Sequence, residues 1–99
     1  MSKGYLLSEA EVSDALAYEA YKQLSASAVA QYGGRYLACG GSIEVLEGAW
    51  SRPERLVIVQ FDSVEQARKF YDSPEYRAAR EVRKNAASTN MLVVEGLQV

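Results

Sequence analysis

The chain has 99 residues, of which 48% are hydrophobic and 24% charged, and its formal net charge is -2. This composition is that of one folded domain near the small end of what can bury a core, and it argues against disorder and against a basic nucleic-acid-binding surface. The first residues lack the apolar core of a signal peptide, and no apolar run reaches the ~20 residues of a membrane span. We therefore expect a single cytoplasmic domain over residues 1–99, with no nucleic-acid and no membrane partner.

Histidine is absent, and Cys39 is the only cysteine. The chain therefore cannot build a histidine-ligated haem, a histidine-rich metal site, or a Ser-His or Cys-His nucleophile pair. A lone cysteine forms no intramolecular disulfide, which agrees with a reducing compartment. Glutamates that alternate along strands could offer oxygen ligands to Mg²⁺ or Ca²⁺, with a solvated face as the alternative. We expect no cofactor and no metal, so that any proton transfer uses Tyr, Glu, Asp, Lys or Arg-assisted water.

The first two predicted elements are a strand over residues 4–12 and a long helix. Ser13 or Asp14 can cap the helix, because their side-chain oxygens accept from the free N–H groups of the first turn. Apolar residues then recur every three or four positions, which is the helical period. This predicted inward stripe consists of Ala17, Tyr21, Leu24, Ala28 and Tyr32. Gly33 ends the helix, where a left-handed residue is needed.

The middle of the chain is predicted to form strand segments and a loop. Residues 35–39 and 42–47 have strand composition and are interrupted by Gly40-Gly41. A glycine pair within a strand indicates a bulge or the close approach of another backbone. The glycines match no phosphate-binding loop. Residues 48–53 are then a loop.

The clearest strand covers residues 55–61 and is apolar on both faces. Leu56 and Ile58 point one way, because side chains alternate along a strand. The residues that point the other way are Val57, Val59 and Phe61. Both faces of this strand must therefore be buried.

Two helices and a strand complete the chain. Ser63 and Gln66 fit a capping box at the start of the first helix. Its predicted inward residues are Val64, Ala67 and Tyr71. Residues 73–75 (Ser-Pro-Glu) begin a second helix, because Ser caps, Pro needs no N–H in the first turn and Glu favours the helix dipole. We expect that helix to run to about Ala87, and residues 90–95 to form the last strand.

The element order is β-α-β-β-α-β, the ferredoxin-like α+β arrangement of an antiparallel sheet with helices on one face. The helices can cover only one face, yet the strands at residues 55–61 and 90–95 are apolar on both. No residues remain for a second layer, and an exposed apolar face of this size is a liability. We therefore predict a homodimer in which two copies pack sheet against sheet.

Several motifs, in order, resemble a known family. They are Gly-Gly-Arg-Tyr-Leu at 33–37, Glu-Val-Leu-Glu-Gly at 44–48 with Trp50, Glu-Arg-Leu-Val at 54–57, and Tyr-Asp-Ser-Pro-Glu-Tyr at 71–76. Over nearly its whole length the chain is similar to the uncharacterised family called domain of unknown function 1330. The resemblance implies a dimeric α+β barrel, a superfamily that includes cofactor-independent monooxygenases, isomerases and non-catalytic stress-response proteins. It implies no particular activity.

Arg83 is the residue whose position is hardest to explain by packing alone. Its helix presents it inward among alanines, with Tyr76 two turns earlier on the same face. A buried unpaired charge is costly, so Arg83 must pair with a carboxylate of its own chain, extend to solvent or meet a ligand. Our hypothesis is that Arg83 lines a cleft near Tyr76 and one of Tyr18 or Tyr21, where it binds a carboxylate or enolate oxygen of a ligand.

The other candidate ligand-binding residues are Arg35, Trp50 and the tyrosines. The guanidinium of Arg35 suits a carboxylate ligand, with an ion pair to Glu44 or Glu47 as the alternative. Trp50 either packs in a dimer interface or covers a pocket. The tyrosines either fill the core or turn their hydroxyls toward a ligand. Cys39, in a strand with no base nearby, is expected to be a small buried hydrophobic residue.

Two functions are open on this reading of the residues. The first is a cofactor-independent enzyme, monooxygenase- or isomerase-like, in which an arginine holds a small anionic or aromatic carbonyl compound and Tyr or Glu moves a proton. The second is a non-catalytic small-molecule-binding dimer, or a structural or stress-response dimer. A cleft in which Arg83 meets tyrosine hydroxyls favours the first, and a filled interior with every arginine in an ion pair favours the second.

Overall fold

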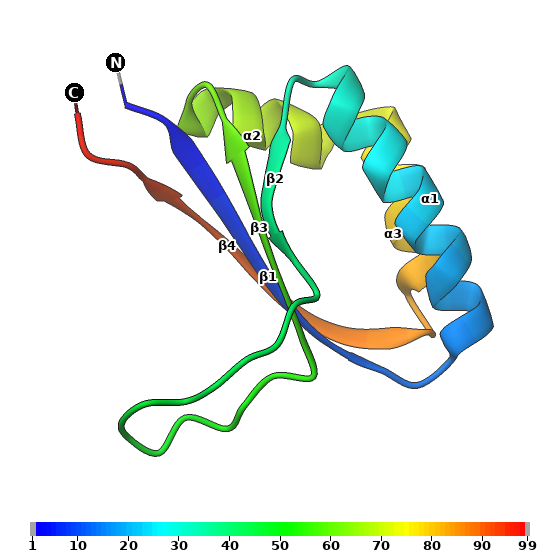
Figure 1. Ribbon diagram of the computed structural model, residues 1–99. Helices are drawn as coiled ribbons and strands as arrows, with labels where there is room; N and C mark the ends of the chain where they lie inside the picture. Colours follow the sequence, from blue (N-terminus) through cyan, green and yellow to red (C-terminus); the bar gives the residue numbers. More distant parts are fainter. Residues whose placement is uncertain (1, 99) are drawn as a thin grey trace.

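The structure is a computed structural model that describes residues 2–98. Within these residues four strands form one antiparallel sheet, and three helices pack on one of its faces (Figure 1). The elements are β1 Gly4–Val12, α1 Ala15–Gln31, β2 Arg35–Cys39, β3 Arg55–Phe61, α2 Val64–Asp72, α3 Pro74–Arg83 and β4 Ala87–Glu95. The strand order is β2-β3-β1-β4. This is the predicted ferredoxin-like α+β arrangement, with the second helical segment divided into α2 and α3.

The ends of α1 are those that the sequence predicts. Asp14 is the cap, and its Oδ1 accepts from the backbone N–H of Ala17 at 3.2 Å. The helix gives way to Gly33, which has a φ of +78°. Such a conformation is readily available to glycine and strained for other residues.

The predicted inward stripe of α1 is confirmed at Tyr21 and Ala28, is partly buried at Ala17 and Tyr32, and is wrong at Leu24. The buried residues are Tyr18, Tyr21, Ser25, Ala28 and Val29. Leu24 is instead 42% exposed, and Ala17 and Tyr32 are half-buried. The reason is that Ala, Tyr and Leu occur all round this helix, so the sequence does not favour one face over its neighbour.

The predicted strand over residues 42–47 is wrong. From Gly40 to Glu54 the chain leaves the sheet as an irregular loop, which projects from the body of the domain (Figure 1). The last residue pair between β2 and β3 is Cys39–Val57, and β3 begins only two residues before Val57, at Arg55. Residues 42–47 therefore have no strand opposite them. Gly40, with a φ of +73°, turns the chain away while its N–H donates to the carbonyl of Leu56. The irregularity within β2 lies between Tyr36 and Ala38 rather than at the glycine pair.

The helix α2 begins as predicted, and its buried face overlaps the predicted one at Ala67. The hydroxyl of Ser63 accepts from the N–H of Gln66 at 3.0 Å. The Gln66 side chain does not close the capping box, because its amide donates to the carbonyl of Tyr32 at 2.9 Å. The buried residues of α2 are Ala67 and Phe70, whereas Tyr71, which was predicted to face inward, is 37% exposed.

The helix α3 is capped by Ser73, whose hydroxyl accepts from the N–H of Tyr76 at 3.1 Å. It ends at Arg83, before the predicted Ala87, and β4 starts at Ala87 rather than at residue 90. The early end has a tertiary cause. The carbonyl of Ala86 accepts from the N–H groups of Ser13 and Asp14, which ties this turn to the end of β1.

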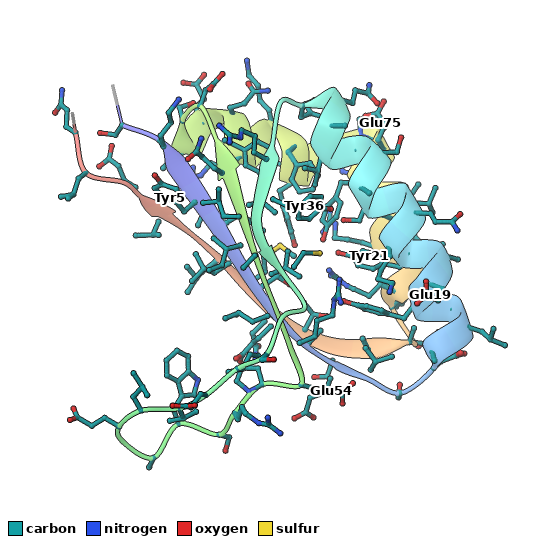
Figure 2. The ribbon with its side chains drawn as sticks, in the orientation of Figure 1. Tyr5, Glu19, Tyr21, Tyr36, Glu54 and Glu75 are labelled. Atoms are coloured by element: carbon teal, nitrogen blue, oxygen red, sulfur yellow. The ribbon has the colours of Figure 1, made fainter. Side chains whose placement is uncertain are left out.

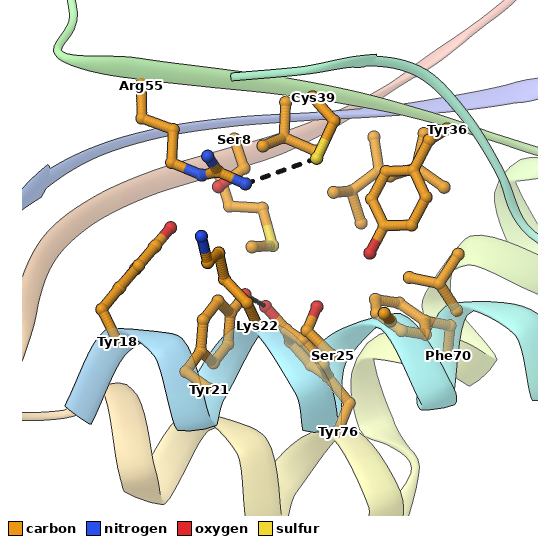
Figure 3. A pocket seen from close by; sticks show the side chains of 16 residues that line it. Ser8, Tyr18, Tyr21, Lys22, Ser25, Tyr36, Cys39, Arg55, Phe70 and Tyr76 are labelled. Carbon is orange, nitrogen blue, oxygen red and sulfur yellow. Dashed lines mark hydrogen bonds between the residues drawn. The ribbon is translucent and has the colours of Figure 1, made fainter. Parts of the chain in front are cut away.

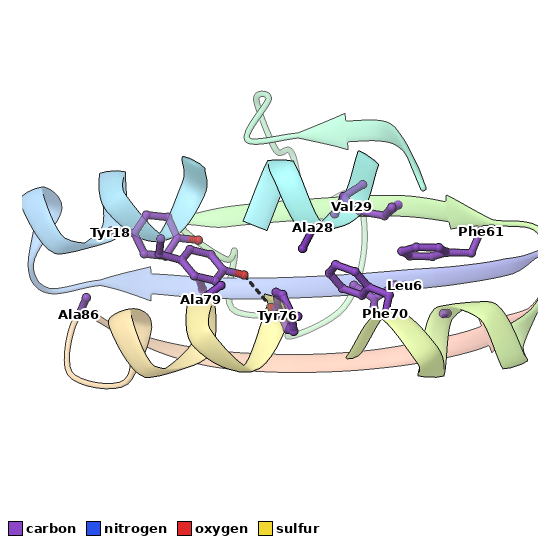
Figure 4. Close-up of a cluster of buried hydrophobic side chains, with 13 residues drawn as sticks. Leu6, Tyr18, Ala28, Val29, Phe61, Phe70, Tyr76, Ala79 and Ala86 are labelled. Carbon is purple, nitrogen blue, oxygen red and sulfur yellow. Dashed lines mark hydrogen bonds between the residues drawn. The ribbon is translucent and has the colours of Figure 1, made fainter. Parts of the chain in front are cut away.

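The core lies between the helices and the inner face of the sheet (Figure 4). On β3 the inner residues include Val59 and Phe61, both at most 2% exposed, and the helices contribute Phe70, Tyr76 and Ala79. The rings of Phe61, Phe70 and Tyr76 follow one another, with centroids 5.1 and 4.4 Å apart. Within the described residues no helix is both long and apolar enough to cross a membrane.

The outer face of the sheet has no cover from residues 2–98 (Figure 1). Leu7 on β1 lies between Ile58 on β3 and Leu92 on β4. These three side chains point away from the helices, because each neighbours an inward residue along its strand. Leu92 is 57% and Val94 is 48% exposed. The sheet thus has one packed face and one open apolar face, as its alternation predicts.

Candidate functional site

A cavity of about 360 Å³ lies between α1 and the inner face of the sheet (Figure 3). Its lining combines apolar and polar side chains. The apolar residues are Leu6, Ala26, Val29, Val57, Val59, Phe70 and Met91. The polar residues are Ser8, Tyr18, Tyr21, Lys22, Ser25, Tyr36, Cys39, Arg55 and Tyr76. This size and this mixture are typical of sites that bind a small organic molecule.

Four tyrosines from three elements converge on this cavity. Tyr18 and Tyr21 come from α1, Tyr36 from β2 and Tyr76 from α3. The rings of Tyr18 and Tyr21 lie 5.2 Å apart, and those of Tyr21 and Tyr76 lie 6.3 Å apart. Burial raises the pKa values of Tyr18 and Tyr36 above the ordinary tyrosine value. These two phenols are therefore neutral at physiological pH and can donate hydrogen bonds.

Among the described residues two cations line the cavity, Lys22 and Arg55. The Nζ of Lys22 forms an ion pair with Glu19 at 2.7 Å. The sheet contributes Arg55. Its guanidinium lies 5.7 Å from the ring centroid of Tyr18, and its Nη2 donates to the Sγ of Cys39 at 3.3 Å (Figure 3). Across residues 2–98 no carboxylate lies within ion-pair distance of it, and its buried Nε has no hydrogen-bond partner. Gly40 leaves room for this side chain, because a Cβ there would collide with Nη1. An arginine in this state has hydrogen-bonding capacity left for an anionic ligand.

Sequence reasoning missed Arg55, although the signal was present. Residues 55, 57, 59 and 61 share one face of β3, and the last three are the inward valines and phenylalanine. A charge in register with core residues is a candidate for a site. Lys22, Ser25 and Ser8 were also missed. Ser8 could have been found in the same way, because it shares one face of its strand with the buried Leu6 and Ala10.

Arg83 lies behind the tyrosines rather than in the cavity wall. Its Nη1 donates to the hydroxyl of Tyr76 at 3.0 Å and to that of Tyr21 at 3.4 Å. The described part of the chain offers it no carboxylate partner. Burial alone would lower the pKa of Arg83, but Tyr76 and Tyr21 outweigh it and the pKa is raised. Burial, together with the neighbouring Tyr21, holds the pKa of Tyr76 far above its ordinary value.

The structure brings together some of the predicted site residues and not others. Tyr18, Tyr21 and Tyr76 line the cavity, with Arg83 in contact with two of them. Arg35 is exposed on β2 and does not line the cavity, nor does it form the alternative ion pair with Glu44 or Glu47. Trp50 is 65% exposed on the projecting loop and likewise lies outside the cavity.

The expectation that Cys39 is buried is wrong. Its side chain is exposed and borders the cavity. The physical reason is that Cys39 ends β2, which is an edge strand, so that only β3 flanks it.

We expect the hydroxyl of Tyr76 to lose its proton only at a pH above the ordinary tyrosine pKa. The folded pKa of Tyr76 lies above the unfolded value of 10.0, so its neutral hydroxyl stabilises the fold fully below pH 10, and this contribution is lost as pH rises further. The wild-type protein should therefore lose more stability between neutral pH and a pH above 10 than Tyr76→Phe does. Denaturant unfolding at the two pH values measures this difference. Equal losses in the two proteins would contradict the assignment.

Replacing Cys39 by serine should change the free energy of unfolding by less than about 0.5 kcal/mol, because the thiol is exposed and the serine hydroxyl can accept from Arg55 as well. Denaturant unfolding and ligand titration check this expectation. Loss of activity in a variant that is still folded would instead indicate a nucleophilic or redox role.

Comparison with solved structures finds the same fold in proteins of low sequence identity. A protein of unknown function from Rhodopseudomonas palustris has a TM-score of 0.77 at 18% identity, over 99% of this chain and 85% of that one. SnoaB, a cofactor-independent oxygenase from Streptomyces nogalater, has a TM-score of 0.72 at 11% identity, over 100% and 97%. A dimeric ferredoxin-like protein of unknown function from Thermobifida fusca has a TM-score of 0.64 at 17% identity, over 97% and 92%.

At these identities the likeness concerns the fold. Comparison with curated proteins finds no match. A family profile, in contrast, matches residues 3–97, which is almost the whole chain. The chain belongs to the family described as domain of unknown function (DUF1330).

Proposed function

We propose that the chain is a homodimeric, cofactor-independent enzyme that acts on a small anionic aromatic or enolisable carbonyl compound in the cavity between α1 and the sheet. The observation that carries this proposal is Arg55. It is a cation without a carboxylate partner among residues 2–98, and it borders an apolar cavity beside neutral phenols. The charge of an aromatic or conjugated anion matches that of Arg55, and its carbon skeleton matches the apolar part of the cavity lining.

The proposed chemistry is stabilisation of a deprotonated substrate. Arg55 holds the anionic group, and phenol hydroxyls with raised pKa values donate to an oxygen on which charge develops. Isomerisation through an enolate and reaction of an electron-rich anion with dioxygen both depend on such stabilisation. The similarity in fold to the cofactor-independent oxygenase SnoaB supports this class of reaction.

The homodimer follows from the open face of the sheet. The centre of that face is apolar at Leu7, Ile58 and Leu92, and a second copy would cover it. The similar protein from Thermobifida fusca is dimeric. The loop over residues 40–54 projects on the side away from the helices (Figure 1, Figure 2). It carries the exposed Leu46 and Trp50, so we place this loop against the partner copy. The exposed thiol of Cys39 favours a reducing, cytoplasmic location.

A second candidate is a dimer that binds the same class of compound without chemistry, or that serves a structural or stress-response role. One observation favours it. The described residues that line the cavity include no aspartate and no glutamate, so an ordinary carboxylate base is missing from the wall.

A thermal-stabilisation screen with small aromatic carboxylates and phenols tests the proposal. We expect aromatic acids to raise the melting temperature and their neutral amides to do so much less, since the amides lack the charge that Arg55 would meet. Each stabilising compound is then incubated with the protein in air and under nitrogen, with its absorption spectrum and oxygen uptake followed. Stabilisation with no turnover would favour the binding protein. Equal response to acids and amides would contradict the site.

A further inference from the structure

The hydroxyls of Tyr21 and Tyr76 form a close pair at one wall of the cavity. Their oxygens lie 2.7 Å apart, and both accept from the same Nη1 of Arg83, at 3.4 and 3.0 Å. The guanidinium also lies 5.2 Å from the ring centroid of Tyr21. Tyr76 is 1% and Tyr21 7% exposed, so bulk water has little access to this pair. The arginine and the two phenols thus form one connected group, which we call the Arg83 triad.

Counting the hydroxyl protons of the two phenols leaves one unused. Each phenol has one proton, and the 2.7 Å contact uses the proton of whichever hydroxyl donates. The second O–H then has no acceptor, because residues 2–98 supply neither hydroxyl with any other hydrogen-bond partner than Arg83, which can only donate. A buried donor that lacks an acceptor is costly. An acceptor atom supplied by a ligand would remove this cost.

The surroundings keep this free hydroxyl a donor. Burial raises the pKa of Tyr76, so the phenol stays neutral and retains its proton. The permanently charged Arg83 polarises both hydroxyls, which strengthens their donation to an oxygen that carries negative charge. Figure 3 shows Tyr21 and Tyr76 on the helix side of the cavity, facing Arg55 on the sheet side. The two sides therefore differ in what they can bind: an anion at Arg55, and an acceptor oxygen at the phenols.

We infer that the Arg83 triad is an oxyanion-binding donor group, and that the ligand is an aromatic or conjugated acid with a second, carbonyl or enolate oxygen that reaches it. The inference rests on the proposed function, since it assigns a role to the opposite wall of the same cavity. Tyr21 and Tyr76 contact the ligand. Arg83 is a positioning residue, because it acts through the two phenols and not on the ligand itself.

The test uses acids that differ only in the second oxygen. The probes are 3- and 4-acetylbenzoate, each paired with the isopropenylbenzoate in which a CH₂ group replaces the carbonyl oxygen. We expect the better acetyl isomer to bind about tenfold or more tightly than its isopropenyl counterpart, as for a charge-assisted hydrogen bond. The infrared carbonyl stretch of the bound acetyl group should move to lower frequency than in water.

Variants of the triad separate positioning from structural support. Arg83→Met should reduce the preference for the acetyl over the isopropenyl acid to about twofold or less, while affinity for the isopropenyl acids stays the same. The carbonyl stretch of the bound acetyl group should return toward its frequency in water. Arg83→Lys should restore part of both effects, because its ammonium can still donate to the phenols. The double variant Tyr21→Phe/Tyr76→Phe removes the free donor whichever hydroxyl carries it. It should act like Arg83→Met, and it provides the same readout if the arginine variants do not fold.

Two negative results have different meanings. If no acid binds the wild-type protein, or if binding does not depend on Arg55, both the proposed function and this inference are wrong. If acids bind through Arg55 but the carbonyl preference is absent, or survives in Arg83→Met and in the double variant Tyr21→Phe/Tyr76→Phe, only the role of the Arg83 triad is wrong.

Discussion

Replacing Arg55 by methionine is expected to weaken the binding of aromatic carboxylates by about 10- to 100-fold, the value of a hydrogen-bonded charge pair in a partly buried site. The same change should leave the free energy of unfolding unchanged or slightly higher. Arg55 has no carboxylate partner among the described residues and a buried Nε without a hydrogen bond. Methionine keeps the apolar stem and removes the desolvated charge. Calorimetric titration and denaturant unfolding measure the two effects.

The matched control is Arg35→Met. It makes the same change in charge and volume at an exposed position on the adjacent strand β2, outside the cavity. Binding in this variant should equal that of the wild type. If both arginine variants weaken binding equally, the effect is one of net charge. If Arg55→Met binds normally, the anion site lies elsewhere.

Replacing Ile58 by aspartate should convert the proposed dimer into a monomer. Ile58 lies next to Leu7 on the open face of the sheet, where a partner sheet would bury it. An unpaired carboxylate at the centre of an apolar interface costs about 3 kcal/mol or more, which raises the dissociation constant at least about 100-fold. Sedimentation velocity at micromolar concentration measures the change. The emission of Trp50, the only tryptophan, should move to longer wavelength if its loop contacts the partner.

Leu16→Asp is the control for this experiment. Leu16 is 86% exposed on α1, which covers the opposite face of the sheet, so the same type of substitution should leave the dimer intact. A wild-type chain that sediments as a stable monomer at micromolar concentration would overturn the dimer. A dimer that persists in Ile58→Asp would show that the interface lies on another surface.

Local patterns in the sequence determined most of the fold. The period-two alternation of β3 and the capping residues Asp14, Ser63 and Ser73 operate over a few neighbouring residues, so they can be read without a structure. The predicted strand at residues 42–47 failed because strand formation also needs a partner strand in register, and β3 offers none there. Within α1 the prediction failed at Leu24, because apolar residues surround this helix and only packing against the sheet selects the buried face.

The candidate site depended more on tertiary structure. The sequence alone marked Arg83 and Tyr76 as unusual neighbours on one helix, since they are seven residues apart. It left open whether Tyr18 or Tyr21, which is 55 residues from Tyr76, completes the group. It did not show that Arg55 and not Arg83 borders the cavity. Such contacts join helices and strands that are distant in the chain, and no local period encodes them. Which face of β3 meets the helices was likewise decided by the packing of α1, α2 and α3, and that packing placed Arg55 inside the domain and Ile58 outside.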